Sequence, residues 1–156
     1  MEDDVNDELG RLLRWIVEQA QKLTDKHTRE DTARVNYACI FSQNTEEYDM
    51  FIRSANKMGK VIRDTPTGPL FNIKPLETKA GKLRLIKIRL PDKTRPERGD
   101  ADFTVSDYST FKKSALENSL ENCRSEVKIE RAYLGSGAAL QGGAYYSLTR
   151  LAGNSF

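Results

Sequence analysis

Hydrophobic residues near the N-terminus recur every three or four positions, which predicts an amphipathic helix over residues 5–23. Acidic residues precede this segment and suit the positive end of a helix dipole. We expect one stripe of the helix to pack against a sheet or a partner. The stripe comprises Val5, Leu9, Leu12, Leu13, Ile16, Val17, Ala20 and Leu23.

An alternating pattern replaces the helical one at residues 34–42, where both faces of an extended segment carry apolar side chains. That pattern is typical of a strand in the interior of a sheet. A second helix is predicted to begin at Asn44 or Thr45, whose side chains can cap its first turn, and to stop at Gly59. Its expected inward positions are Tyr48, Phe51, Ile52, Ala55 and Met58.

Three more strands are predicted after a turn-rich hinge at residues 64–69. The first, residues 70–76, contains Pro75, which predicts that it lies at a sheet edge or ends there. The second covers residues 82–90, and the third follows the loop PDKTRPERG and covers residues 100–106. In that loop, proline removes backbone donors and Gly99 is expected to permit the turn into the third strand.

The strand at residues 82–90 contains two apolar alternations that are out of phase by one residue. Leu83 and Leu85 follow the first alternation, and Ile86, Ile88 and Leu90 follow the second. This predicts a bulge near Leu85 and Ile86 that keeps both sets on the core face. The opposite face then carries four cations, which are Lys82, Arg84, Lys87 and Arg89.

Residues 100–106 place Asp100 and Asp102 on one face and Ala101 and Phe103 on the other. If this strand paired with residues 82–90 as an antiparallel hairpin, the basic face would lie beside the aspartates. Matching of opposite charges between neighbouring strands would then explain why the two segments are so highly charged.

The remaining sequence predicts a helix at residues 107–122, a short strand within EVKIERAYL, and a glycine-rich, flexible tail at residues 134–156. The pattern as a whole predicts an α+β fold, in which one domain over residues 1–133 builds a mixed or antiparallel curved sheet with helices packed on it.

Composition narrows the functional classes only slightly. The chain has 156 residues, of which 31% are charged, and a net charge of +2. Such a small excess argues against general attraction to nucleic acid or membranes. No apolar run approaches a membrane span. The acidic start does not resemble a secretory leader, and the two cysteines, Cys39 and Cys123, fit buried thiols in a reducing compartment, so we expect a cytoplasmic protein.

Two segments of residues 34–106 carry a resemblance to a known family. They are RVNYACIFSQNTEEYDMFIRSANKMGKVIRDT and RLIKIRLPDKTRPERGDADFTV. Together they resemble a βαβββ module of the vicinal oxygen chelate superfamily, the group of glyoxalases and extradiol dioxygenases, and are most similar to its YecM type, in which a helical segment precedes the first module. Because one module makes half a barrel, the resemblance implies a homodimer, or a monomer whose open sheet is covered by the N-terminal helix.

The metal chemistry of that family transfers poorly to this chain. The resemblance places its metal-ligand positions at Asn36 or Val35 and at Asp102 and Thr104. A single carboxylate without imidazoles is a weak transition-metal site. We therefore expect no working metal centre and no cofactor.

The sequence leaves several functions open. The preferred candidate is a ligand-binding polar face that clamps a small anion or organic acid with guanidinium groups. It comprises Arg84, Arg89, Asp102, Thr104, Arg95 and Arg98. The alternatives are a surface of solvated ion pairs, a nucleic-acid-binding accessory protein, which the near-neutral charge disfavours, and a degenerate metal-dependent lyase or dioxygenase. His27 is the only histidine and no nucleophile motif is present, so a non-enzymatic module is favoured over an enzyme.

Overall fold

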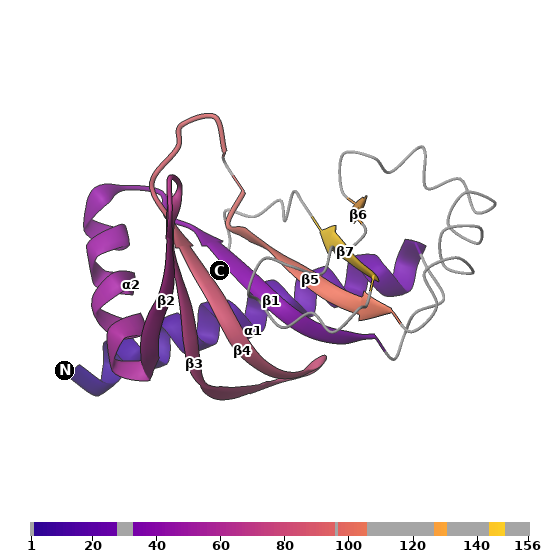
Figure 1. Cartoon of the computed structure of the whole chain (residues 1–156), viewed down its shortest axis with the longest axis horizontal. Coiled ribbons are helices and arrows are strands. Elements are labelled where there is room, and N and C mark those ends of the chain that lie inside the picture. The colour runs from indigo at the N-terminus through magenta and orange to yellow at the C-terminus, as the bar shows by residue number, and fades with distance from the viewer. Residues whose placement is uncertain (1, 28–32, 96, 106–126, 131–143, 149–156) are drawn as a thin grey trace.

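The chain folds as an α+β protein in which an open, curled sheet carries helices on one face (Figure 1). The computed structural model describes residues 2–27, 33–95, 97–105, 127–130 and 144–148. Within these residues the elements are α1 (Glu2–His27), β1 (Arg34–Phe41), α2 (Thr45–Met58), β2 (Gly59–Thr65), β3 (Gly68–Thr78), β4 (Gly81–Arg89), β5 (Gly99–Val105), β6 (Val127–Glu130) and β7 (Ala144–Leu148).

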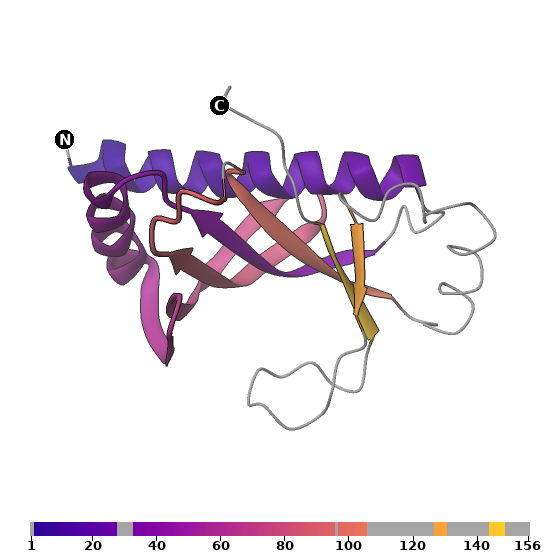
Figure 2. The same ribbon diagram turned by 90° about the horizontal axis from the view of Figure 1, so that it is seen from above.

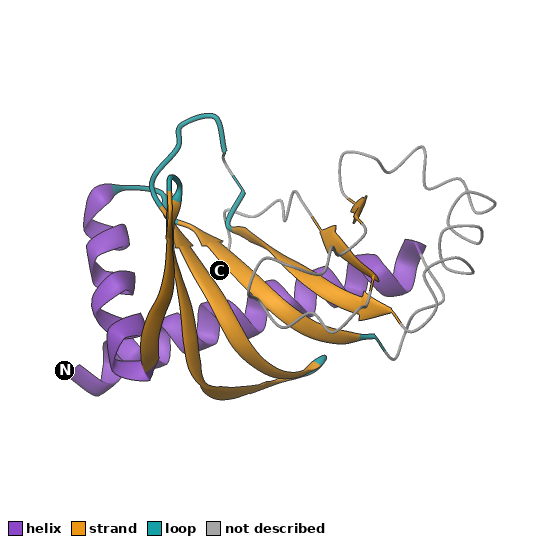
Figure 3. Cartoon of the chain, viewed as in Figure 1, coloured by secondary structure: helices purple, strands orange, loops and turns teal. Residues whose placement is uncertain are grey.

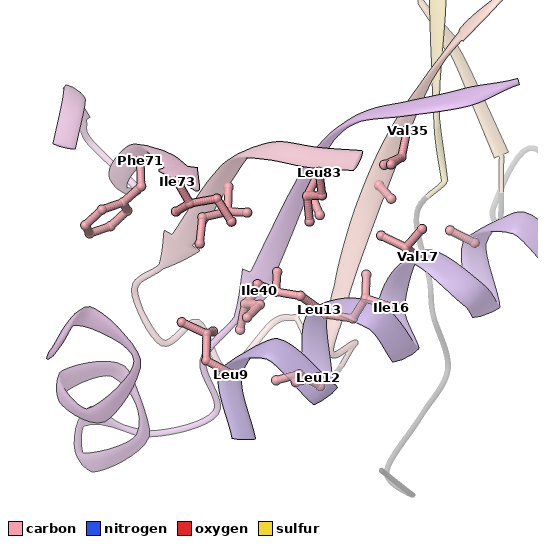
Figure 4. Packing of buried hydrophobic residues seen from close by; sticks show 14 of the residues in the cluster. Leu9, Leu12, Leu13, Ile16, Val17, Val35, Ile40, Phe71, Ile73 and Leu83 are labelled. Carbon is pink, nitrogen blue, oxygen red and sulfur yellow. The ribbon is translucent and has the colours of Figure 1, made fainter. Parts of the chain in front are cut away.

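Helix α1 runs along one face of the sheet, and α2 lies beside its N-terminal end (Figure 2). The apolar stripe predicted for the first helix is confirmed at Leu9, Leu12, Leu13, Ile16, Val17 and Ala20, which are all buried. The side chains of Val5 and Leu23 are not among those that the structure describes. Figure 4 shows this stripe packed against Val35 and Ile40 of β1 and Leu83 of β4. The helix extends to His27, four residues beyond its predicted end at residue 23.

Helix α2 begins and ends as its sequence predicts. Asn44 is the N-cap, and its side chain accepts a hydrogen bond of 2.8 Å from the backbone N–H of Glu47. Gly59 follows the last turn. Phe51 and Ala55 are buried in the core between the helices and the sheet.

Strand β1 is the central strand, as its two apolar faces predict. The sheet order is β2-β3-β4-β1-β5-β7-β6. β1 is parallel to β4 and antiparallel to β5. A register shift between Val35 and Tyr37 leaves Asn36 as an extra residue, so that Val35, Ala38 and Ile40 all join the core under the helices.

The predicted hairpin between β4 and β5 is wrong, because β1 lies between these strands. In the sheet, Lys87 is level with Cys39, and Cys39 is level with Asp100. Two strand spacings, about 10 Å, therefore separate the basic and acidic positions. Charge matching between neighbouring strands does not explain this part of the sequence.

Strand β2 occupies residues that the sequence predicted in part as a hinge. It pairs with β3 around a tight turn at residues 66–67. Gly68 has φ +139°, and a Cβ there would lie 2.0 Å from the carbonyl oxygen of Ile88. Five consecutive β2 residues, 60–64, are exposed, so this strand lacks the apolar alternation that marks the others.

The bulge predicted in β4 lies instead in its neighbour. Both apolar alternations reach the core only in part, since Leu83, Ile86 and Ile88 are fully buried, whereas Leu85 is half-buried. The register shifts between Asn72 and Leu76 of β3, so the extra residues belong to β3. Leu90 is 45% exposed, outside the core.

Pro75 fits the position that its chemistry predicts. It lies in the irregular part of β3, past Ile73, the last residue that pairs with β2. The outer side of β3 is therefore a free edge at this point, where a residue without a backbone donor is tolerated.

The C-terminal region adds two strands. β6 confirms the short strand predicted within EVKIERAYL, and β7, which lies in the expected tail, was not predicted. β7 pairs with β5 and β6. The predicted helix at residues 107–122 lies outside the described residues. Among the described helices, none combines the length and apolar character that a bilayer crossing needs.

Candidate functional site

The face of the sheet opposite α1 carries the chemically most varied side chains. β1 contributes Tyr37, Cys39 and Phe41, which alternate with the core residues Ala38 and Ile40. The strand register places Phe41 level with Arg89 of β4, and Tyr37 level with Asp102 of β5. Cations therefore lie on one side of β1 and carboxylates on the other.

Two guanidinium groups gather on one aromatic ring at the end of β1. The Cζ atom of Arg89 lies 5.4 Å from the centroid of the Phe41 ring, and that of Arg95 lies 6.0 Å from it. These distances are within the range of cation–π attraction. Phe41 itself is 3% exposed, so the ring is a fixed support for both cations.

Asp92 is the carboxylate that holds this arrangement together. Its Oδ2 lies 3.6 Å from Nη2 of Arg89, while its Oδ1 accepts hydrogen bonds from the backbone and hydroxyl of Thr94 at 2.9 and 2.6 Å. The hydroxyl bond of Thr94, then its backbone bond, then the charges of Arg89 and Arg95 lower the pKa of Asp92. The carboxylate is therefore ionised at neutral pH.

We call Phe41, Arg89, Asp92 and Arg95 the Phe41 cluster. Two guanidinium groups and one carboxylate give it an excess of one positive charge. Lys87 lies two residues before Arg89 on β4 and donates a hydrogen bond to the Thr67 hydroxyl in the turn between β2 and β3. It adds a third cation beside the cluster.

The opposite side of β1 is acidic, with Cys39 buried and Tyr37, Asp100 and Asp102 half-buried. Asp100 and Asp102 of β5 lie level with Cys39 and Tyr37. Burial is the main reason that the pKa of Cys39 is raised, and the charge of Asp100 raises it further. Burial likewise raises the pKa of Tyr37, with Cys39 and Asp100 as the next causes. Both groups therefore stay protonated at neutral pH, and Cys39 is not an activated nucleophile.

Thr104 takes part in a hydrogen bond between strands. Its hydroxyl accepts a bond of 2.7 Å from Nδ2 of Asn36, the extra residue of β1. This contact ties β5 to the irregular part of β1. Thr104 is two strands away from the guanidinium groups that it was predicted to assist.

The six predicted site residues fall into separate groups. Arg89 and Arg95 meet at Phe41, whereas Asp102 and Thr104 lie on β5. Arg98 forms an ion pair of 2.7 Å with Glu47 at the start of α2. Arg84 is exposed and makes no ion pair or hydrogen bond with the residues that the structure describes.

Sequence reasoning did not identify Phe41 or Asp92 as parts of the site. Phe41 was expected only as an apolar strand position, and it lies 48 positions before Arg89 in the sequence. Asp92 carried one signal, because an aspartate two residues before a threonine is typical of a local turn. The hydrogen bonds to Thr94 fit that pattern.

Comparisons with family models, with curated proteins and with solved structures found no match to this chain. Within the described residues, no group of three or more histidine, cysteine, aspartate or glutamate side chains is placed to hold a metal ion. A function for this protein is therefore inferred from the side chains of the Phe41 cluster.

Proposed function

We propose that the Phe41 cluster binds a small anion, such as a phosphate or the carboxylate of an organic acid, and that the protein acts as a non-enzymatic binding module. One observation carries this proposal: Arg89 and Arg95 share one buried ring while a single carboxylate faces them. Guanidinium groups offer paired N–H donors that match the geometry of carboxylates and phosphates.

The two arginines are suited to different parts in binding. The Arg89 side chain is 22% exposed and is held by Phe41 and Asp92, so little conformational freedom is lost when it contacts a ligand. Arg95 is exposed and can close on the ligand from the loop. Lys87 supplies further positive charge from the same face of β4.

Thermal-shift titrations with inorganic phosphate and with succinate, at constant ionic strength, test this proposal. We expect both anions to raise the melting temperature of the wild-type protein more than chloride does. Arg95→Gln is expected to weaken binding about tenfold, the effect of losing one charge-assisted hydrogen bond. Arg84→Gln removes the same charge from an exposed position away from the cluster and is expected to bind normally. Equal melting temperatures in all salts would contradict the proposal.

We also propose kinship with the vicinal oxygen chelate superfamily. The element order β1, α2, β2, β3 and β4, over Arg34–Arg89, supports this proposal. It has the βαβββ order that the resemblance implies, and it ends one strand earlier than the sequence suggested. Anion binding by the Phe41 cluster does not depend on this kinship.

A further inference from the structure

The Phe41 cluster continues into a basic surface on the same face of the sheet. The strand register places Arg63 of β2 level with Leu70 of β3, and Leu70 level with Lys87 of β4. Side chains at level positions on neighbouring strands share a face, so Arg63 and Lys87 lie on the face that carries Arg89. The adjoining row comprises Lys60, Asn72 and Leu85. None of the six residues in these two rows is acidic.

Lys87 extends its ammonium group toward the β2 side of this surface. The Nζ atom donates a hydrogen bond to the hydroxyl of Thr67, in the turn between β2 and β3. The hydroxyl of Thr65, which lies two residues after Arg63, is 3.4 Å from that of Thr67. Lys87 is half-buried, and it forms no ion pair within the part of the chain that the structure describes. A partly dehydrated cation with a neutral hydroxyl as its partner attracts an anion, because an opposite charge compensates for the lost water.

The turn that holds Lys87 lies beside the Phe41 cluster. The backbone N–H of Leu90 donates to the carbonyl oxygen of Thr67 at 2.9 Å, so the turn is attached to the residue that follows Arg89. Figure 3 shows the β2–β3 turn and the β4–β5 loop, both in teal, at the same end of the sheet. Lys87 and Arg89 are two residues apart on one strand, a separation of about 7 Å. Two anionic groups of one small molecule can therefore contact both positions.

We propose that this surface binds a ligand that carries two or more phosphate groups. One group lies in the Phe41 cluster, and a second lies between Lys87 and Arg63. The inference rests on anion binding by the Phe41 cluster and adds the class of ligand. Four cationic side chains then face the ligand against the single carboxylate of Asp92, an excess that suits a polyanion better than a singly charged acid.

A small polyphosphate fits this surface better than a nucleic acid does. Proteins that bind single strands combine a basic groove with exposed aromatic rings on which the bases stack. Over strands β1 to β5, the aromatic residues of this face are Phe41, which is 3% exposed, and Tyr37, which is half-buried. Bases would therefore find little aromatic surface to stack on.

Isothermal titration calorimetry at constant ionic strength tests the inference by comparing inorganic phosphate with tripolyphosphate. The wild-type protein is expected to bind tripolyphosphate at least about tenfold more tightly than phosphate, because a second group adds a charge-assisted hydrogen bond. Lys87→Gln and Arg63→Gln are each expected to remove most of this gain and to leave phosphate binding nearly unchanged. Lys74→Gln removes the same charge from an exposed position of β3, past the residues that pair with β2, and is the control that should keep the gain.

The outcomes separate this inference from the proposed function. Phosphate binding without a gain for tripolyphosphate, or a gain that both variants retain, would overturn the inference while anion binding by the Phe41 cluster stands. A protein that binds neither anion would overturn both. A single-stranded oligonucleotide that binds more tightly than tripolyphosphate would also overturn the inference, in favour of a nucleic-acid surface. Circular dichroism establishes that each variant is folded, and Arg63→Gln, at an exposed position, provides the test even if Lys87→Gln does not fold.

Discussion

At the scale of single residues, the need for glycine at position 99 was predicted correctly but for the wrong reason. Its sequence context predicted a turn, yet Gly99 is the first residue of β5 and pairs with Ile40 of β1. A Cβ at this position would lie 2.2 Å from the carbonyl oxygen of Cys39 and 2.7 Å from Cδ1 of Ile16. Glycine is needed here because β1 and α1 approach so closely.

We predict that Gly99→Ala lowers the free energy of unfolding by about 1–3 kcal/mol, because the added methyl group forces β1 and β5 apart. Urea denaturation measures the change. Gly10→Ala is the matched control, since a Cβ at Gly10 meets its nearest atom at an ordinary 3.5 Å and α1 gains helix propensity. Equal stability of the Gly99→Ala variant and the wild type would show that β5 does not lie where we describe it.

Cys39 and Tyr37 predict a loss of stability in alkaline solution. Their pKa values are raised in the folded state, mainly by burial. Above about pH 8.5 for the thiol, and about pH 10 for the phenol, the unfolded chain releases protons that the folded chain retains. The free energy of unfolding must therefore fall as pH rises, by up to about 1.4 kcal/mol per pH unit for each group.

The expected signature is a change in slope between variants. Unfolding free energies measured from pH 7 to pH 11 should fall less steeply for Cys39→Ala than for wild type from about pH 8.5, and less steeply for Tyr37→Phe from about pH 10. Parallel curves for wild type and both variants would mean that these side chains are not buried as described.

At the scale of elements, the loop between β4 and β5 is anchored to α2. Arg98 and Glu47 form an ion pair with only 12% and 21% of their side chains exposed, and the side chain of Gln43 donates to the carbonyl oxygen of Glu97 at 3.1 Å. The backbone N–H of Phe41 donates to the carbonyl oxygen of Arg98 at 2.9 Å. These contacts fix the end of the loop that carries Arg95.

A double-mutant cycle on Glu47→Gln and Arg98→Gln should give a coupling energy of about 1–2 kcal/mol, because water screens this pair only in part. The same cycle on Glu77 and Lys82, a pair with 72% and 59% exposed side chains, should give a coupling near zero. Equal couplings in the two cycles would remove the anchoring that we assign to Arg98.

Periodicity predicted the elements with strong one-sided or two-sided burial, and missed the others. α1 and α2 were recognisable because their buried positions recur at helical spacing, and β1 and β4 because their apolar residues alternate apart from one break in each strand. β2 was missed because residues 60–64 are all exposed, and the proline and glycine that follow were interpreted as a hinge. β7 was missed within a glycine-rich segment whose composition is typical of a tail.

At the scale of the whole molecule, the sequence did not determine which strands are neighbours. The pattern of residues 82–106 fits a hairpin, yet β5 pairs with β1 on the side away from β4. Alternation specifies which side chains share a face, while the order of strands depends on contacts between distant residues. For the same reason Arg89 and Arg95 were predicted as site residues, and Phe41, which brings them together, was not.

The strand order predicts how fast backbone amides exchange with solvent. β1 has neighbours on both sides and lies in the core, so its amides should exchange most slowly among the described strands. β2, at the edge, should exchange fastest among β1 to β5 in dilute solution. Hydrogen–deuterium exchange followed by mass spectrometry measures both. Faster exchange in β1 than in β2 would contradict the sheet order.

The most direct test of the anion-binding proposal is a nuclear magnetic resonance titration of the isotope-labelled protein with inorganic phosphate at constant ionic strength. We predict saturable shifts of the backbone amide signals of Phe41, Arg89 and residues 92–95, which are lost in the Arg95→Gln variant. Saturable shifts confined to residues outside the Phe41 cluster, or no saturable shifts at all, would contradict anion binding at this cluster.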